Sequence, residues 1–148
     1  MVARRARKTK KTRKTRKTKG GAKMIIQYPS FTVNNSQSTI EDTSMKPNIL
    51  LAPLNLSTFI MYDPDAVQPQ WVHYLVINIP NGDISKGDEV LSYNGPTPPS
   101  GIHRYIFEQL EQTSPYQISI ERAGFDIDTF RKQNALIKRE TARMRIPS

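Results

Sequence analysis

The chain has 148 residues, 36% of them apolar and 8% aromatic, which suits the core of one domain and argues against a two-domain enzyme. It contains no cysteine, so disulfides, thiolate nucleophiles and cysteine-held metal or iron–sulfur sites are excluded. Residues 1–23 hold 12 of the 22 Lys and Arg and no acid, which leaves 10 basic and 13 acidic groups, a net charge of −3, in residues 24–148. An acidic body with a basic tail is expected, and the bulk charge of that body does not favour nucleic acid.

The basic tail contains the stretch KTKKTRKTRKTK at residues 8–19, which has no apolar side chain to offset the entropy of ordering. We predict a disordered tail over residues 1–23 and a folded domain over residues 24–148, separated near a Gly-Gly joint. The tail suits electrostatic contact with nucleic acid, an anionic membrane or the import machinery. No apolar run approaches the roughly 18–20 residues of a membrane span, and the N-terminus lacks the apolar core of a secretory signal. We therefore expect a cytoplasmic protein, with the nucleus as an alternative.

Short runs of β-branched and aromatic residues follow the tail, broken by Pro, Gly, Asn and Asp, and this pattern is typical of an all-β sandwich or barrel. In the second run both the odd positions 71, 75 and 77 and the even positions 72, 74 and 76 are apolar, which predicts a central strand covered on both faces. The fourth run alternates more openly and suits an edge or half-buried position. The four predicted strands are Leu56–Tyr62, Trp71–Asn78, His103–Leu110 and Tyr116–Glu121.

The C-terminal region contains the one helix signal. Asp128 can cap a helix that runs through Phe130 to Leu136. Beyond it, apolar residues at 142, 144 and 146 alternate with polar and basic ones, which predicts a closing strand with a basic outer face. A basic helix continuing over residues 128–145 is the alternative. The predicted fold is mainly β, an antiparallel sandwich with a short C-terminal helix.

Two histidines, His73 and His103, are the only ones in the chain, and both lie in predicted strands beside segments rich in turn residues. Asp63 directly follows the first predicted strand, and the proline after it cannot continue a ladder. Tyr105 lies on the same face of its strand as His103, as Trp71 does with His73. These polar groups are the candidate site.

Four segments in this region resemble the phosphatidylethanolamine-binding protein family, which includes the Raf-kinase inhibitor proteins and the plant flowering regulators. They occur in the order of the family, and the D-P-D-A, W-x-H-x-L-V-x-N and G-x-H-R-Y elements agree almost letter for letter. The resemblance implies a β-sandwich with a small anion pocket for phosphate, acetate or a phospholipid head group, no metal and no cofactor, and kinases or other signalling proteins as partners. The four segments are YDPDA at 62–66, WVHYLVIN at 71–78, YNGPTPPSGIHRYIFEQLEQ at 93–112 and GFDIDTFRKQNAL at 124–136.

The resemblance also implies a set of ligand-binding residues. Imidazoles and unpaired loop N–H groups are donors for phosphate oxygens, and a carboxylate can hold an imidazole in one tautomer. Asp65, Trp71 and Arg104 are expected in supporting roles, Arg104 through an ion pair with Asp65 and Trp71 as a core aromatic rather than a stacking platform. The expected ligand-binding residues are Asp63, His73, Gly95, Pro96, His103 and Tyr105.

Two enzyme alternatives were weighed against this expectation. Two histidines and one carboxylate match the composition of a facial triad for non-haem iron, but they lack the short spacing of known metal motifs. Serine hydrolysis lacks a G-x-S-x-G element. The expected function is therefore a non-enzymatic binding module for a phosphate-bearing ligand or phospholipid head group, with regulation of signalling partners as a further role. A polyanion- or nucleic-acid-associated adaptor with a vestigial pocket is the alternative.

Overall fold

A computed structural model describes residues 23–148. The predicted tail, residues 1–23, lies outside this part of the chain except for Lys23, so it stays a prediction. Two single turns of 3-10 helix, Glu41–Thr43 and Ile84–Lys86, lie in connecting loops. The main elements are the strands β1 (Ile25–Gln27), β2 (Asn48–Leu50), β3 (Leu56–Asp63), β4 (Trp71–Pro80), β5 (Asp88–Leu91), β6 (Ile102–Glu111) and β7 (Ile137–Pro147) and the helix α1 (Ile127–Gln133).

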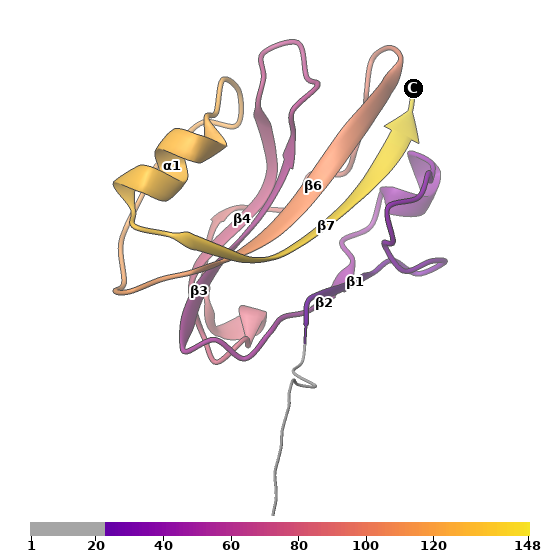
Figure 1. Ribbon diagram of the computed structural model, residues 1–148. Helices are drawn as coiled ribbons and strands as arrows, with labels where there is room; N and C mark the ends of the chain where they lie inside the picture. The colour runs from indigo at the N-terminus through magenta and orange to yellow at the C-terminus, as the bar shows by residue number, and fades with distance from the viewer. Residues whose placement is uncertain (1–22) are drawn as a thin grey trace, which may run out of the picture.

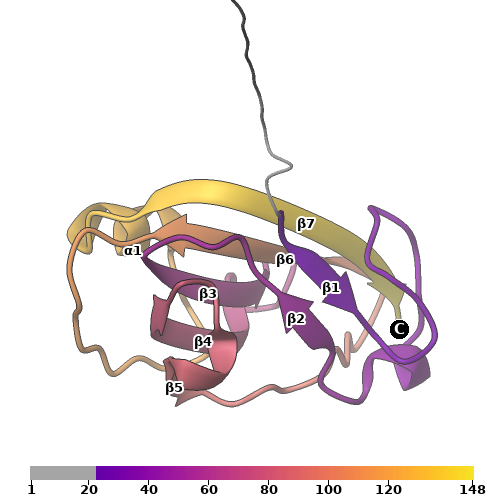
Figure 2. The same ribbon diagram turned by 90° about the horizontal axis from the view of Figure 1, so that it is seen from below.

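The strands form a five-stranded antiparallel sheet in the order β5-β4-β3-β6-β7 and a two-stranded antiparallel sheet of β1 and β2. Figure 1 shows the helix on one side of the large sheet and the β1–β2 pair on the other, and Figure 2 shows the same arrangement from below. Three of the predicted strands, the closing strand and the short helix are confirmed. The alternative of a basic helix over residues 128–145 is wrong, because residues 137–147 pair along β6.

Each face of the large sheet has its own apolar core. Side chains of β3, β4, β6 and β7 pack with Ile26 and Tyr28 on the face covered by the small sheet. On the opposite face, Ile127 and Phe130 of α1 pack against β3, β4 and β6. The sheet is therefore covered on both faces, as the apolar pattern predicted, and β3 rather than β4 is its middle strand.

A β-bulge in β4 changes the face to which its side chains point. Met61 pairs with Tyr74 and Tyr62 with Val72, so His73 is an extra residue between two pairs. The bulge places Val72 on the α1 face together with the odd positions 75 and 77, and His73 and Tyr74 on the other face. The predicted odd–even division of this strand is therefore wrong on the N-terminal side of the bulge.

The fourth predicted strand, Tyr116–Glu121, is also wrong, because this segment joins neither sheet. Ile118 and Ile120 pack against the core beneath α1, which explains the alternating pattern without strand pairing. The segment is attached through side chains instead: the Asn78 amide oxygen accepts from the Tyr116 backbone N–H at 3.1 Å. The alternation of apolar and polar residues in this segment reflects the burial of one of its sides and not pairing with a neighbouring strand.

The cap of α1 differs from the predicted one by two residues. Asp126, not Asp128, is the N-cap, and its carboxylate accepts from the backbone N–H groups of Asp128 at 3.0 Å and Thr129 at 3.2 Å. Asp128 lies in the first turn, where its charge also favours the helix dipole. Two nearby acids compete for one capping position, and the sequence pattern does not distinguish them.

Candidate functional site

A cavity of about 350 Å³ opens at the end of the large sheet where β3 ends and β4 and β6 begin. Antiparallel order brings these strand ends together: Asp63, the last residue of β3, is paired with Trp71, the first of β4. The loop after β3 and the loop before β6 form the remaining wall. The cavity is lined by Asp63, Ala66, Val67, Gln68, Trp71, His73, Thr97, Pro98, Pro99, His103 and Tyr105.

A carboxylate–imidazole pair forms one wall of this cavity. His103 Nδ1 lies 2.6 Å from Asp63 Oδ2, and the two residues are only 7% and 3% exposed. The other oxygen of Asp63 accepts from the Asp65 backbone N–H at 2.7 Å. Asp63 therefore accepts the Nδ1 proton of His103, so that the ring's Nε2 is the atom left for a ligand.

His73 also lines this cavity and is held by the backbone instead of by a carboxylate. Its Nδ1 lies 2.5 Å from the carbonyl oxygen of Asn94, and its ring packs edge-on against Trp71 and Tyr105, with centroids 4.7 and 5.1 Å apart. Burial lowers the pKa of His73 below its usual value, and the hydrogen bond to Asn94 and the charge of Asp63 oppose that shift. His73 is therefore mostly neutral near pH 7.

The protonation of the two rings decides what the site can bind. Neither Nε2 atom has a hydrogen-bond partner within residues 23–148. When Nδ1 carries the only proton, Nε2 is an acceptor, and it becomes a donor for an anion only in the protonated ring. The expectation that both imidazoles donate to phosphate is thereby refined. Either the anion carries a P–OH group that donates to a neutral Nε2, or the ring takes up a proton and donates to the anion.

The supporting residues are in two different situations. Arg104 makes the predicted ion pair with Asp65, with Nη2–Oδ1 at 2.8 Å and Nε–Oδ2 at 2.9 Å, and this pair holds the pKa of Asp65 below its usual range. Trp71 is half-buried on the cavity wall, so its expected place in the core is wrong. Pairing with Asp65 fixes the loop after β3, whereas Trp71 is available to a ligand.

Sequence reasoning missed Arg122, which lies behind this wall. Its guanidinium carbon is 5.4 Å from the centre of the Trp71 ring, and its nitrogens donate to the carbonyl oxygens of Val72, His73 and Ser92 at 3.1, 3.2 and 2.8 Å. Arg122 is 49 residues from His73 and belongs to none of the recognised segments, so no local signal identified it.

Gly95 and Pro96, by contrast, do not line the cavity. A Cβ atom at Gly95 would lie 3.0 Å from the Thr43 carbonyl oxygen, so this glycine allows the loop to approach the segment after β1 rather than a ligand. The three residues that follow, Thr97, Pro98 and Pro99, line the cavity instead. The predicted loop is in place, but its contact with the cavity is shifted along the chain.

No group of three or more His, Asp or Glu side chains in residues 23–148 is arranged to hold a metal ion. The facial-triad alternative would need Asp63, His73 and His103 to share one ion. In the structure, Asp63 Oδ2 is bound to His103 Nδ1. These three side chains therefore suit a ligand that accepts and donates hydrogen bonds better than a metal ion.

The fold is that of the phosphatidylethanolamine-binding proteins. Residues 16–143 match the family model described as phosphatidylethanolamine-binding protein. Because that match covers most of the 148 residues, the chain belongs to this family.

Two plant relatives match part of the chain. MOTHER of FT and TFL1 homolog 2 from Oryza sativa subsp. japonica is 45% identical over 69 residues, which are 42% of this chain and 40% of that protein. BROTHER of FT and TFL 1 from Arabidopsis thaliana is 38% identical over 77 residues, 45% of this chain and 44% of that protein. The matched regions thus span less than half the length of these relatives.

Two solved structures share the fold. Carboxypeptidase Y inhibitor, in a crystal structure with its cognate proteinase, has a TM-score of 0.73 and 19% identity over 84% of this chain and 82% of that chain. A protein described as a homologue of phosphatidylethanolamine-binding protein, from Chlamydia trachomatis, has a TM-score of 0.51 and 16% identity over 85% of this chain and 97% of that chain.

In residues 23–148 no helix is long and apolar enough to cross a membrane.

Proposed function

We propose that this chain is a non-enzymatic binding module that holds a phosphate-bearing ligand or a phospholipid head group in the cavity between His73 and His103. One observation carries the proposal: two buried imidazoles line a cavity of about 350 Å³, and each has its Nδ1 already bonded. Small-molecule sites occupy roughly 300–1,000 Å³ and combine a few polar groups with apolar walls. The cavity has this size and composition.

The walls suit a phosphate ester better than free phosphate. Trp71, Pro98 and Pro99 supply apolar surface beside the two imidazoles, and Val67 at the mouth is 86% exposed. A phosphate group at the imidazoles would leave an attached alcohol or glycerol portion against this apolar wall. A head group with its ester carbons therefore fits both parts of the site.

Proton linkage follows from the geometry. Because each Nε2 donates only in a protonated ring, phosphate binding favours the imidazolium form, and affinity should rise as the pH falls through the histidine range. Near pH 6 the ligand takes up its own second proton, and its P–OH group can then donate to a neutral ring, but the monoanion attracts an imidazolium less strongly, which offsets the gain. We expect a shallow optimum at mildly acidic pH.

The proposal includes the wider organisation of the chain. Residues 24–148 are the binding domain and residues 1–23 a basic tail, in a cytoplasmic or nuclear protein. Carboxypeptidase Y inhibitor, which shares the fold, was crystallised with its cognate proteinase, and this supports adding a protein partner, such as a kinase or another enzyme, to the proposal. No catalytic step is assigned to Asp63, His73 or His103.

Titration of ¹⁵N-labelled protein with phosphorylethanolamine tests the site. We expect a dissociation constant of roughly high-micromolar to millimolar, because a few donors at an open cavity gain little over water. Shifts should be confined to the neighbourhoods of Asp63, His73, His103 and Thr97–Pro99, and should weaken in His73→Ala. Ethanolamine without phosphate is the control ligand. Shifts elsewhere, or none up to ~10 mM, would refute the proposal.

A further inference from the structure

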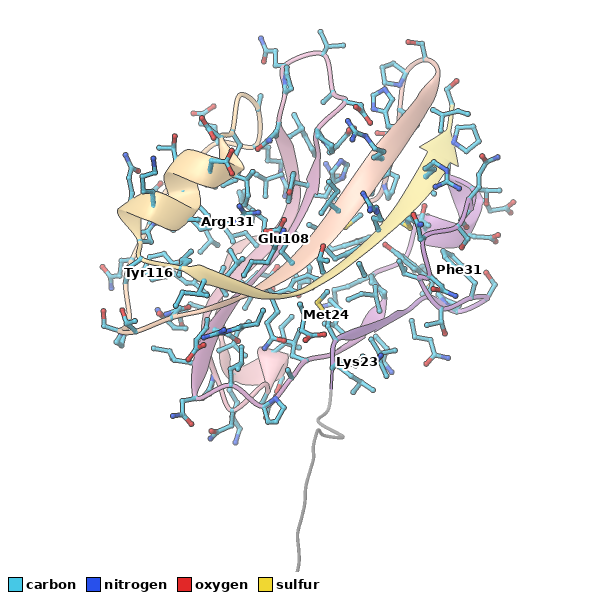
Figure 3. All side chains as sticks on the ribbon, viewed as in Figure 1. Lys23, Met24, Phe31, Glu108, Tyr116 and Arg131 are labelled. Carbon is cyan, nitrogen blue, oxygen red and sulfur yellow. The ribbon has the colours of Figure 1, made fainter. Side chains whose placement is uncertain are left out.

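A second hollow, of about 620 Å³, lies away from the histidine cavity, between the start of β1 and the outer edge of β7. In Figure 1 the indigo start of the described chain lies below the yellow strand β7, and Figure 3 labels Lys23 and Met24 at this start. Met24, Val33 and Ala142 form an apolar floor. Exposed polar and basic side chains form the walls: Lys23, Thr32, Asn34, Asn35, Thr141 and Arg143.

The edge of β7 is closed on one side of the hollow and open on the other. The Arg143 carbonyl accepts from the Asn35 N–H at 2.8 Å, and the Arg145 N–H donates to the Ser36 carbonyl at 3.0 Å. Thr141, two residues earlier, has no such backbone partner in residues 23–148. The hollow therefore contains hydroxyl, amide and backbone donors that a ligand can use.

The cations at this edge are not balanced by the protein itself. Within residues 23–148, neither Lys23, Arg143 nor Arg145 forms an ion pair, whereas Arg139 of the same strand is paired with Glu111 at 2.6 Å. Arg104, directly across from Arg145 on β6, is likewise paired, with Asp65 at 2.8 Å. An anion bound beside Lys23 and Arg143 would supply the missing counter-charge.

One acid lies beside the hollow. Glu140 is half-buried and is not among the residues that line the hollow, and its Oε1 accepts from the Met24 backbone N–H at 3.3 Å. The rest of the domain is acidic, since residues 24–130 carry 4 basic and 12 acidic groups. Positive charge is thus concentrated at one edge of a negative body.

We propose that this hollow, with Lys23 and Arg143 on opposite sides, binds the sugar–phosphate backbone of a nucleic acid. A guanidinium fork matches a phosphate in two-point contact, the amide and hydroxyl groups supply neutral donors, and the apolar floor accommodates a sugar face. The walls present no exposed aromatic ring for stacking, so binding is independent of base sequence. Residues 1–22, which continue from Lys23, hold eleven more Lys and Arg.

A chain-like polyanion fits these observations better than a lipid surface. The cations flank a concave hollow, which a strand can enter and a flat bilayer cannot. Residues 1–22 contain no Phe, Trp or Leu for insertion into a bilayer. The exposed apolar side chains nearby are Ile25 and its cross-strand partner Leu50, which are 41% and 58% exposed. A membrane would have to bind through these two residues, so Ile25 is the position at which that alternative is tested.

The test measures fluorescence anisotropy of a labelled 20-nucleotide single strand with the full chain at ~50–200 mM salt. Each lost phosphate contact reduces the slope of log K against log[salt] by roughly 0.7–1. The double variant Lys23→Ala/Arg143→Ala should therefore bind about tenfold or more weakly near 0.1 M salt, with a shallower slope. Arg139→Ala is the matched control, because it removes an arginine of the same strand that is already paired.

Loss of affinity equal to that of Arg139→Ala, or no loss at all, would overturn the proposal and leave the tail as the binding element. Preferential binding to phosphatidylserine vesicles that weakens on Ile25→Ser would overturn it in favour of a membrane. Because both substituted side chains are exposed, unchanged melting is expected. If the double variant does not fold, ¹⁵N shifts of the wild-type chain with the same oligonucleotide decide: they must include residues 23–25, 32–35 and 141–143.

Discussion

Two carboxylates are buried in the large sheet, and they are held in different ways. Glu108 is 2% exposed and lies under α1, where both of its oxygens accept from Arg131 Nη2 at 2.8 Å and one accepts from the Tyr62 hydroxyl at 2.8 Å. Figure 3 labels Glu108 and Arg131 in this region. Asp63 is 3% exposed and is paired with His103 at the wall of an open cavity.

The difference lies in the partner. An arginine is charged at every accessible pH, so the pair of Glu108 and Arg131 attaches the helix to the sheet permanently. A histidine ring has two nitrogens, so His103 keeps its Nε2 for a ligand while its Nδ1 is bonded to Asp63. The same sheet thus uses one buried carboxylate for stability and presents the other to a binding site.

The largest expected effect concerns the helix side of this comparison. Arg131→Met should lower the free energy of unfolding by about 3–5 kcal/mol, because it leaves the Glu108 carboxylate buried without its cation. Urea unfolding at pH 7 measures this loss. Arg139→Met is the control, since its pair with Glu111 is about half exposed and surface pairs contribute roughly 0–1 kcal/mol. Equal losses in the two variants would mean that Glu108 is not sealed from water.

His103→Ala should have a smaller effect on stability. Asp63 loses one partner but keeps the Asp65 backbone N–H, and water from the cavity can reach the carboxylate. We expect a loss of about 1–3 kcal/mol, the range for a buried polar group left without one partner. Phosphorylethanolamine binding should weaken at the same time, whereas in Arg131→Met, measured where that protein is folded, it should persist. If His103→Ala lowered the free energy of unfolding as much as Arg131→Met, Asp63 would depend on its partner as strongly as Glu108 does, and the proposed difference between the two carboxylates would be wrong.

Local sequence pattern was sufficient for most of the large sheet. The runs at 56–62, 71–78 and 103–110 combine β-branched and aromatic residues with clear turn signals, so propensity and burial agree. The bulge at His73 was not predictable, because it depends on the register between β3 and β4 rather than on either strand alone. The strand predicted after β6, at Tyr116–Glu121, was wrong for a similar reason. Its alternating pattern reflects packing on one side, and its attachment depends on Asn78, far away in the chain.

The candidate site follows the same division. Asp63, His73 and His103 were expected together because the resemblance to the phosphatidylethanolamine-binding protein family implies one pocket for them, and the structure places all three around one cavity. The positions of Gly95 and Arg122 depended on contacts with distant segments, which no local pattern records. The family resemblance thus identified the site residues on the strands, whereas the loops and side chains behind them require the packed structure.

The smallest expected effect is a pH dependence that sets His73 apart from the permanently charged pair. Its pKa in the folded chain lies below its usual value, mainly through burial, while Asn94 and Asp63 raise it and Arg122 and His103 lower it further. In the unfolded chain the pKa is about 6.5, so below that pH the unfolded state binds more protons and stability falls as the pH decreases. His73→Asn removes the titrating ring while its amide can still donate to the Asn94 carbonyl. Thermal melts between pH 8 and 5 should show a smaller decrease for this variant than for the wild type. Parallel curves would mean that burial does not lower the pKa of His73 in the folded chain.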